Sequence, residues 1–143
     1  MKIAALLISP ILFAVACCLP ALDFTTSEGG QDVMWGANIL IVGWSGLFGG
    51  IMGWYANPFW ILGVFLGFLR KPWWAAGAGV FAFLIACSTF QLMGQTIPGD
   101  EGNVTHLTLV RFLPGFYFWM SSMVTLPVLV FFNRPHPAPI RPA

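Results

Sequence analysis

The chain has 143 residues, of which 58% are hydrophobic and only 8% are charged. Soluble domains carry about a quarter charged residues, so this composition excludes an ordinary soluble protein and indicates an integral membrane protein. The formal net charge of +1 says nothing by itself about nucleic acid, and we predict no nucleic-acid partner.

Four long stretches of the chain contain no charged residue, and each is long enough to cross a bilayer, which takes about twenty apolar residues. We predict an all-α membrane protein, a four-span helical bundle with both termini in the cytoplasm. The polar segments between the stretches are too short to bury a core, so residues 1–143 form a single integral membrane domain. The predicted spans are residues 3–22, 33–55, 73–94 and 112–132, the outer loops are 23–32 and 95–111, and a disordered tail covers 134–143.

The first apolar stretch has two interpretations. It follows Lys2, and Ala14-Val15-Ala16 before Cys17 imitates a signal-peptidase site. We favour a retained span because the apolar run is longer than a usual signal core. Cleavage or lipidation near Cys17 stays open as the alternative.

The distribution of charge sets the predicted orientation, because basic residues near span ends are retained in the cytoplasm. Four crossings place almost all basic residues inside and all acidic residues outside. Arg111 is the exception, and we expect it to pair with Asp100 or Glu101 or to hold a lipid phosphate. The inner bases are Lys2, Arg70, Lys71, Arg134 and Arg141, and the outer acids are Asp23, Glu28, Asp32, Asp100 and Glu101.

The second apolar stretch, residues 33–69, is too long for one crossing, since a helix of that length would measure about 55 Å. Asn57 and Pro58 mark the expected break, because Asn caps a helix start and Pro suits its first position. We predict a span that ends near Tyr55 and a short half-membrane helix over 58–69. A hairpin that gives five spans is the alternative.

Small residues recur at helical spacing on two predicted spans. In lipid, helices associate by close packing, and rows of small residues let two backbones approach. We predict that the two rows face each other and hold the bundle together. The first row is Gly36, Gly43, Gly46, Gly50 and Gly53, and the second is Ala75, Gly79, Ala82, Ala86 and Thr89.

The sequence offers few groups for chemistry. All acids and bases lie outside the spans or at their ends, so a proton relay or an ion-coupled transporter lacks its ionisable residues. We predict no enzymatic activity, because no base accompanies a nucleophile in a recognisable motif. We also predict no cofactor and no metal, and read Cys17, Cys18 and Cys87 as small hydrophobic residues. A Cu(I) site of these thiols with Met and His side chains is a weaker alternative.

Three stretches carry a resemblance to a known family: LPALDF at Leu19–Phe24, the run from Gly36 to Leu62 that contains WYANP, and PGFYFWMSSM at Pro114–Met123. In these the chain resembles a family of small, uncharacterised bacterial inner-membrane proteins. The resemblance implies a multi-pass protein of the bacterial inner membrane. It implies no activity and no site residues.

The function that we predict is therefore non-enzymatic. The protein acts through helix packing and partner binding, as an accessory or assembly subunit or as a toxin-immunity-like protein. Its partners are the lipid bilayer and either another membrane protein or further copies of itself. Arg111, Asn57 and Pro58 are the expected partner or lipid contacts. The alternative is a subunit of a small oligomeric transporter or channel, in which the broken helix at Asn57 and Pro58 would expose backbone groups to a substrate.

Overall fold

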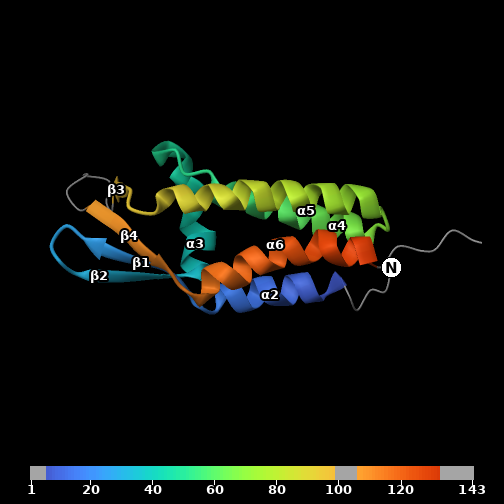
Figure 1. The fold of residues 1–143 in the computed structure, drawn as a ribbon, viewed down its shortest axis with the longest axis horizontal. Coiled ribbons are helices and arrows are strands. Elements are labelled where there is room, and N and C mark those ends of the chain that lie inside the picture. The colour runs from blue at the N-terminus through green and yellow to red at the C-terminus, as the bar shows by residue number, and fades with distance from the viewer. Residues whose placement is uncertain (1–5, 99–105, 133–143) are drawn as a thin grey trace, which may run out of the picture.

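The computed structural model describes residues 6–98 and 106–132, with only the backbone for 47–49 and 98. Within them it contains five α-helices and a four-stranded antiparallel sheet. The predicted all-α four-span bundle is therefore wrong, and the chain is mixed α/β. Figure 1 shows the two parts end to end: the longer helices run side by side, and the sheet projects from one end of them.

The helical part consists of α2, α4, α5 and α6. Helix α4 packs against α5, α5 against α6, and α6 against α2. Pro72 begins α5, a position where its missing N–H costs nothing. The bounds are α2 (Ile8–Cys17), α4 (Ala56–Phe68), α5 (Pro72–Cys87), which continues as the 3₁₀ helix η3 (Ser88–Leu92), and α6 (Pro114–Phe132).

The sheet has the strand order β2-β1-β4-β3. Strands β1 and β2 form a hairpin whose turn is closed by hydrogen bonds between Thr26 and Gly30 and by Gly29 at φ +84°. Strand β1 also pairs with β4, so both predicted outer loops contribute strands to one sheet. The bounds are β1 (Pro20–Thr26), β2 (Gln31–Trp35), β3 (Thr96–Pro98) and β4 (His106–Phe112).

The predicted span over 33–55 does not exist as one helix. After β2 the chain forms the short helix α3 (Gly36–Val42), the 3₁₀ helix η1 (Gly43–Gly49) and the 3₁₀ turn η2 (Gly53–Tyr55). Helix α3 lies across the end of the bundle in Figure 1. Glycine is a poor helix former, and Gly50 at φ +74° adopts the left-handed conformation that ends a helix. The glycines that fit a helical stripe thus permit turns instead.

The short helix predicted over 58–69 is α4, which begins two residues earlier at Ala56. Asn57 is not its cap: the residue before the helix is Tyr55, and no side chain caps that end. The turn after α4 places Arg70 at φ 57°, the left-handed region, and leads into α5.

Two helices are long and apolar enough to cross a membrane: α5 with η3, over Pro72–Leu92, and α6, over Pro114–Phe132. Helices α2 and α4, with 10 and 13 residues, are shorter than a full crossing. The five-span alternative is wrong as well. Lys2, Arg134, Arg141, Asp100, Glu101 and the predicted tail over 134–143 lie outside the described residues.

The buried residues form two clusters, one in each part. Small and flexible side chains dominate the bundle cluster, in which Ala56, Ala82, Ala86 and Met123 are fully buried. The second cluster lies where the sheet meets the bundle and is built from larger residues, among them Phe24, Leu109 and Phe116. Between this second cluster and α3 the packing leaves a cavity.

Candidate apolar binding cavity

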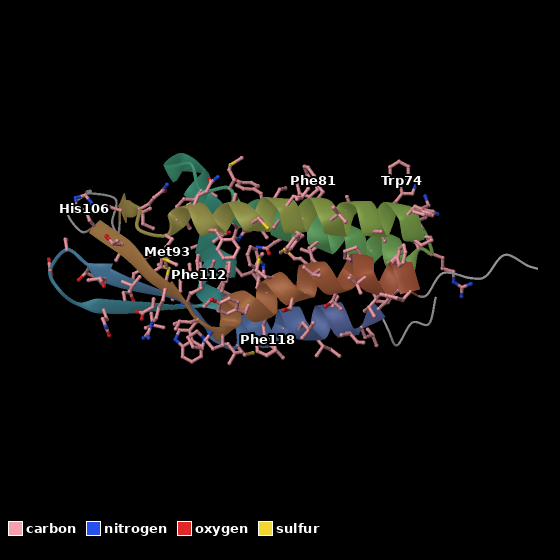
Figure 2. The ribbon with its side chains drawn as sticks, in the orientation of Figure 1. Trp74, Phe81, Met93, His106, Phe112 and Phe118 are labelled. Atoms are coloured by element: carbon pink, nitrogen blue, oxygen red, sulfur yellow. The ribbon has the colours of Figure 1, made fainter. Side chains whose placement is uncertain are left out.

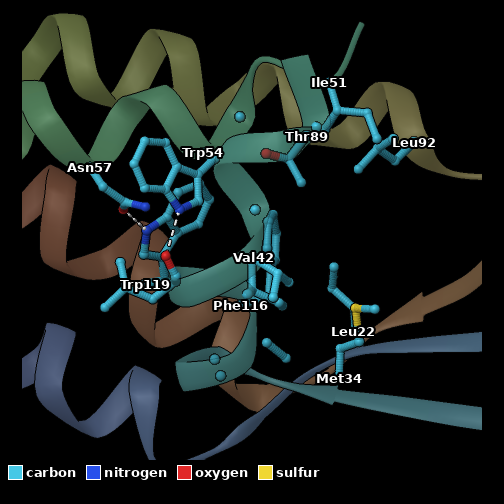
Figure 3. Close-up of a pocket in the computed structure, with 18 of the residues that line it drawn as sticks. Leu22, Met34, Val42, Ile51, Trp54, Asn57, Thr89, Leu92, Phe116 and Trp119 are labelled. Carbon is cyan, nitrogen blue, oxygen red and sulfur yellow. Dashed lines mark hydrogen bonds between the residues drawn. The ribbon is translucent and has the colours of Figure 1, made fainter. Parts of the chain in front are cut away.

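The cavity has a volume of about 700 Å³ and is bounded by both parts of the molecule. The sheet supplies Leu22, Phe24 and Met34, and the bundle supplies Asn57 and Phe116. Figure 3 shows Leu22 and Met34 on the sheet side, opposite the tryptophan and Asn57 side chains on the bundle side. Leu22 and Phe24 reach the same space because alternate residues of a strand point to one face.

The walls are chiefly apolar and carry no charge. None of the described residues that line the cavity is acidic, basic or a histidine. Ligand pockets of proteins span roughly 300–1,000 Å³ and are lined by apolar and aromatic side chains with a few polar groups. The cavity matches this description, and its uncharged walls favour an uncharged occupant because an unpaired charge is costly away from water.

The polar groups of the wall are held by specific hydrogen bonds. The indole nitrogen of Trp119 on α6 donates to Oδ1 of Asn57 on α4 at 2.8 Å. The indole nitrogen of Trp54 donates to the Leu40 carbonyl at 2.9 Å. Both bonds are drawn in Figure 3. They fix two aromatic rings at the bundle end of the cavity.

Thr89, on η3, is another polar residue of this wall. Its hydroxyl is buried and has no hydrogen-bond partner among the described residues. The backbone of Gly53 covers it so closely that a Cβ at Gly53 would collide with the hydroxyl oxygen. Gly53 therefore closes the wall over Thr89, and a larger residue there would push η2 away from η3.

The glycine row predicted as a helix-packing stripe lies mainly around the cavity. Gly36, Gly43, Gly46 and Gly53 line it, whereas Gly50 lies in a turn with no atom near the position of its missing Cβ. Gly36 does allow a close backbone contact, with Ala16 at the end of α2. The five glycines do not form one stripe, because the helix that would align them is absent.

The second row lies on one buried face of α5, where Ala75, Gly79, Ala82 and Ala86 are all buried. Only part of the glycine row meets it: Gly53 lies against Thr89 on η3, whereas Gly36 and Gly43 lie against Ala16 and Trp54. At Gly79 a Cβ would lie 2.8 Å from Cδ of Pro127 on α6. On the neighbouring helix α4, a Cβ at Gly63 would lie 3.2 Å from the carbonyl oxygen of Ala75. The small residues of α5 thus allow α4 and α6 to pack closely against it.

The three predicted contact residues are not brought together. Asn57 lines the cavity, while Pro58 beside it is exposed on α4. Arg111 lies on β4 away from the cavity wall, and its Nε atom forms an ion pair with Oδ2 of Asp23 at 2.7 Å. The structure pairs Arg111 with Asp23 because strand β1 presents Asp23 directly opposite Arg111. Asp100 and Glu101, the partners expected from the sequence, lie outside the described residues.

The ion pair is asymmetric. The Asp23 side chain is 5% exposed and that of Arg111 is 66% exposed. Oδ1 of Asp23 is buried without a partner among the described residues. Arg111 therefore compensates a carboxylate that the sheet has largely removed from water.

A separate hydrogen-bonded group holds the bundle together. Ser9 on α2 donates to the carbonyl of Ser122 on α6 at 2.7 Å and accepts from the indole nitrogen of Trp60 on α4 at 2.9 Å. The rings of Phe13 and Trp60 stack beside it, with centroids 4.2 Å apart. One serine thus links three helices.

The described residues contain no group of three or more His, Cys, Asp or Glu side chains able to hold a metal ion. Of the residues weighed for copper, Cys17 and Met34 line the cavity and Cys18 is exposed. Figure 2 shows His106 and Met93 toward the sheet end, away from Trp74 at the far end of α5. The arrangement suits binding of an apolar molecule rather than metal chemistry.

Sequence reasoning missed Trp54, Trp119 and Asp23 as site residues. For Asp23 a signal existed, because one acid ends the first apolar stretch and one base, Arg111, begins the last. For the tryptophans there was no comparable signal, since aromatic residues are spread along the apolar stretches. Only the crossing of α3, α4 and α6 brings their rings to one space.

Comparisons of the chain with protein-family models, with curated proteins and with solved structures gave no match.

Proposed function

We propose that the chain is a multi-pass protein of the bacterial inner membrane that binds a neutral, apolar molecule from the bilayer in the cavity and performs no chemistry on it. The resemblance of its motifs to small inner-membrane proteins supports the location. In this proposal the helices lie in the membrane, and the sheet lies at its outer surface and closes one side of the cavity.

The surface of the helices supports the membrane location. In each candidate span only 33% of the most apolar window is buried within the protein, whereas the core helix of a soluble protein is mostly buried. Large apolar side chains such as Leu84 and Phe131 are more than half exposed. Water would make such a surface an aggregation hazard, while lipid accommodates it.

The charges support the orientation. The turn between α4 and α5 carries Arg70 and Lys71, and the sheet at the opposite end carries Asp23, Glu28 and Asp32. Basic residues near span ends are retained on the cytoplasmic side. The turn therefore faces the cytoplasm and the sheet faces outward.

The observation that carries the function is the cavity itself, a space of about 700 Å³ with uncharged and chiefly apolar walls. A hollow of this size, lined by apolar and aromatic side chains with a few polar groups, is typical of a site for a small apolar molecule. Binding of this kind needs no catalytic group, and it suits an accessory subunit that holds a membrane component or presents it to a partner.

The test is to purify the protein from membranes in mild detergent, extract it with organic solvent and identify the bound molecules by mass spectrometry. We expect an apolar compound in stoichiometric amount. Met34→Trp should fill the cavity from the sheet side and lower the amount recovered several-fold. The matched control is Met52→Trp, since Met52 is half-exposed and does not line the cavity.

Recovery of the same compounds in equal amounts from both variants would count against the cavity as the binding site. Extracts that contain only the bulk lipid mixture of the membrane, in wild type as in Met34→Trp, would refute the proposed function.

A further inference from the structure

Asn57 is a buried amide with hydrogen-bonding capacity left over. Its side chain lines the cavity, and the residue is 4% exposed. An indole N–H can only donate, so the bond from Trp119 requires the oxygen of Asn57 on that side and leaves the NH₂ group on the other. Within the described residues this is the only hydrogen bond of the Asn57 side chain. Its N–H donors therefore need an acceptor.

The other polar groups of the wall cannot supply that acceptor or replace the donor. Both indole N–H groups, of Trp54 and Trp119, are engaged, so their rings present apolar carbon to the cavity. The Thr89 hydroxyl is buried beneath the backbone of Gly53, and the Ser45 hydroxyl, which also lines the cavity, donates to the Val42 carbonyl. Apart from the weakly donating Cys17 thiol, an occupant of the cavity thus meets one free side-chain donor among the described residues, the Asn57 amide, among fixed aromatic rings (Figure 3).

The depth of Asn57 restricts the occupant further. Helix α4 has 13 residues and is about 20 Å long, whereas α5 with η3 spans 21 residues and about 31 Å. The two helices meet at the turn that contains Arg70, so Asn57 lies about 10 Å short of the outer end of η3. Since the hydrocarbon core is about 30 Å thick, the amide lies inside the hydrocarbon layer, below the level of lipid headgroups.

We propose that the cavity binds a quinone-type molecule: a neutral, planar ring with a carbonyl oxygen that accepts from the Asn57 amide and an apolar tail that the bilayer dissolves. Such a molecule is uncharged like the walls, offers an acceptor to the unused donor and a flat face to the tryptophan rings, and keeps its polar group inside the hydrocarbon layer. This inference rests on the proposed function, because it names the occupant of the same cavity.

The probe for the test is a decyl-substituted benzoquinone, which quenches tryptophan fluorescence on contact. We expect saturable quenching in purified wild-type protein. Decylbenzene, which lacks the carbonyl groups, should compete about five- to tenfold more weakly, as expected for one buried hydrogen bond. Methyl decanoate, a linear carbonyl compound, should also compete more weakly, because it lacks the ring.

The variant that removes the donor is Asn57→Leu combined with Trp119→Phe, so that no indole N–H is left unpaired. Trp54 remains in it as reporter. The preference for the quinone over decylbenzene should fall to about onefold in this variant. It should be unchanged in Ser88→Ala, because that hydroxyl bonds the Ile85 carbonyl and does not line the cavity.

The outcomes separate the two proposals. Equal binding of all three compounds to wild type, or a quinone preference that survives loss of Asn57, overturns the quinone inference and leaves the apolar cavity in place. If methyl decanoate binds more tightly than the quinone, the occupant is an acyl ester and not a ring compound, and the quinone inference is likewise overturned. Failure of every compound to bind saturably refutes the proposed function together with the inference.

Discussion

Both ends of the bundle contain rows of small residues, but the two ends pack differently. Along α5 and α6 the helices touch through Gly79 and Pro127, and Ser9 links three helices through hydrogen bonds. At the sheet end, larger side chains surround a cavity of about 700 Å³. The comparison teaches that small residues allow close packing only where continuous helices run side by side. Where glycines interrupt the helix, as around Gly50, the chain bends over an open space.

The largest effect is expected where packing is tightest. Gly79→Leu should destabilise the protein by about 3 kcal/mol, because even its Cβ would lie 2.8 Å from the Pro127 ring. Gly77→Leu is the matched control on the same helix, since no atom lies within 4 Å of the position of its Cβ. Thermal unfolding in detergent measures both. Equal losses in the two variants would show that helix propensity, and not the contact with α6, decides the outcome.

A charge on the helix surface tests the contrast between lipid and water. Leu84 on α5 and Val110 on β4 are both exposed, at 61% and 52%. Leu84→Arg should cost about 2.5–3.5 kcal/mol of membrane insertion, while Val110→Arg on the sheet should be nearly neutral. The yield of membrane-inserted protein is the measurement. Full insertion of Leu84→Arg would contradict a lipid-facing α5.

Loss of the serine that links the helices should cost less. Ser9→Ala leaves the indole nitrogen of Trp60 without its acceptor, and we expect a loss of about 1–2 kcal/mol in unfolding free energy. Ser45→Ala removes an exposed hydroxyl that bonds within its own turn, and should change stability little. If both variants unfold at the wild-type temperature, the linkage through Ser9 does not stabilise the bundle.

The ion pair of the sheet should contribute about 1 kcal/mol, because Arg111 is mostly exposed and water screens it. Arg111→Gln leaves the buried Asp23 carboxylate without a cation. Adding Asp23→Asn to that variant should restore part of the loss, since the buried charge is then gone. A double-mutant cycle by thermal unfolding measures the coupling, and strictly additive effects would show that the two side chains do not interact.

The smallest effect is expected at the hollow end. Met34→Trp adds bulk inside the cavity, and we expect it to change the unfolding free energy by less than about 1 kcal/mol, because there is space to receive the ring. The two variants are unfolded under the same conditions, so that their losses of unfolding free energy can be compared directly. A loss as large as that of Gly79→Leu would mean that the sheet end is packed as tightly as the bundle.

The sequence by itself indicated a membrane protein, because a low fraction of charged residues and long apolar stretches are properties of composition. It also predicted a short helix over nearly the residues of α4, and the small residues of α5, since local patterns record helical spacing. The sheet could not be found in the same way. Strands β1 and β4 are paired across more than eighty residues of chain, and neither polar segment alone has the length to form a core.

Tertiary structure alone decided the cavity and its polar group. Glycine spacing fits a helix and a series of turns equally well, and only packing against α2, α5 and the sheet selected the turns. Asn57 fits a helix cap in the sequence. In the structure its oxygen instead accepts the indole N–H of Trp119, from a distant part of the chain, and this is the only bond of its side chain among the described residues. Contacts between residues far apart in the chain depend on which surfaces meet, and no local pattern in this sequence records that.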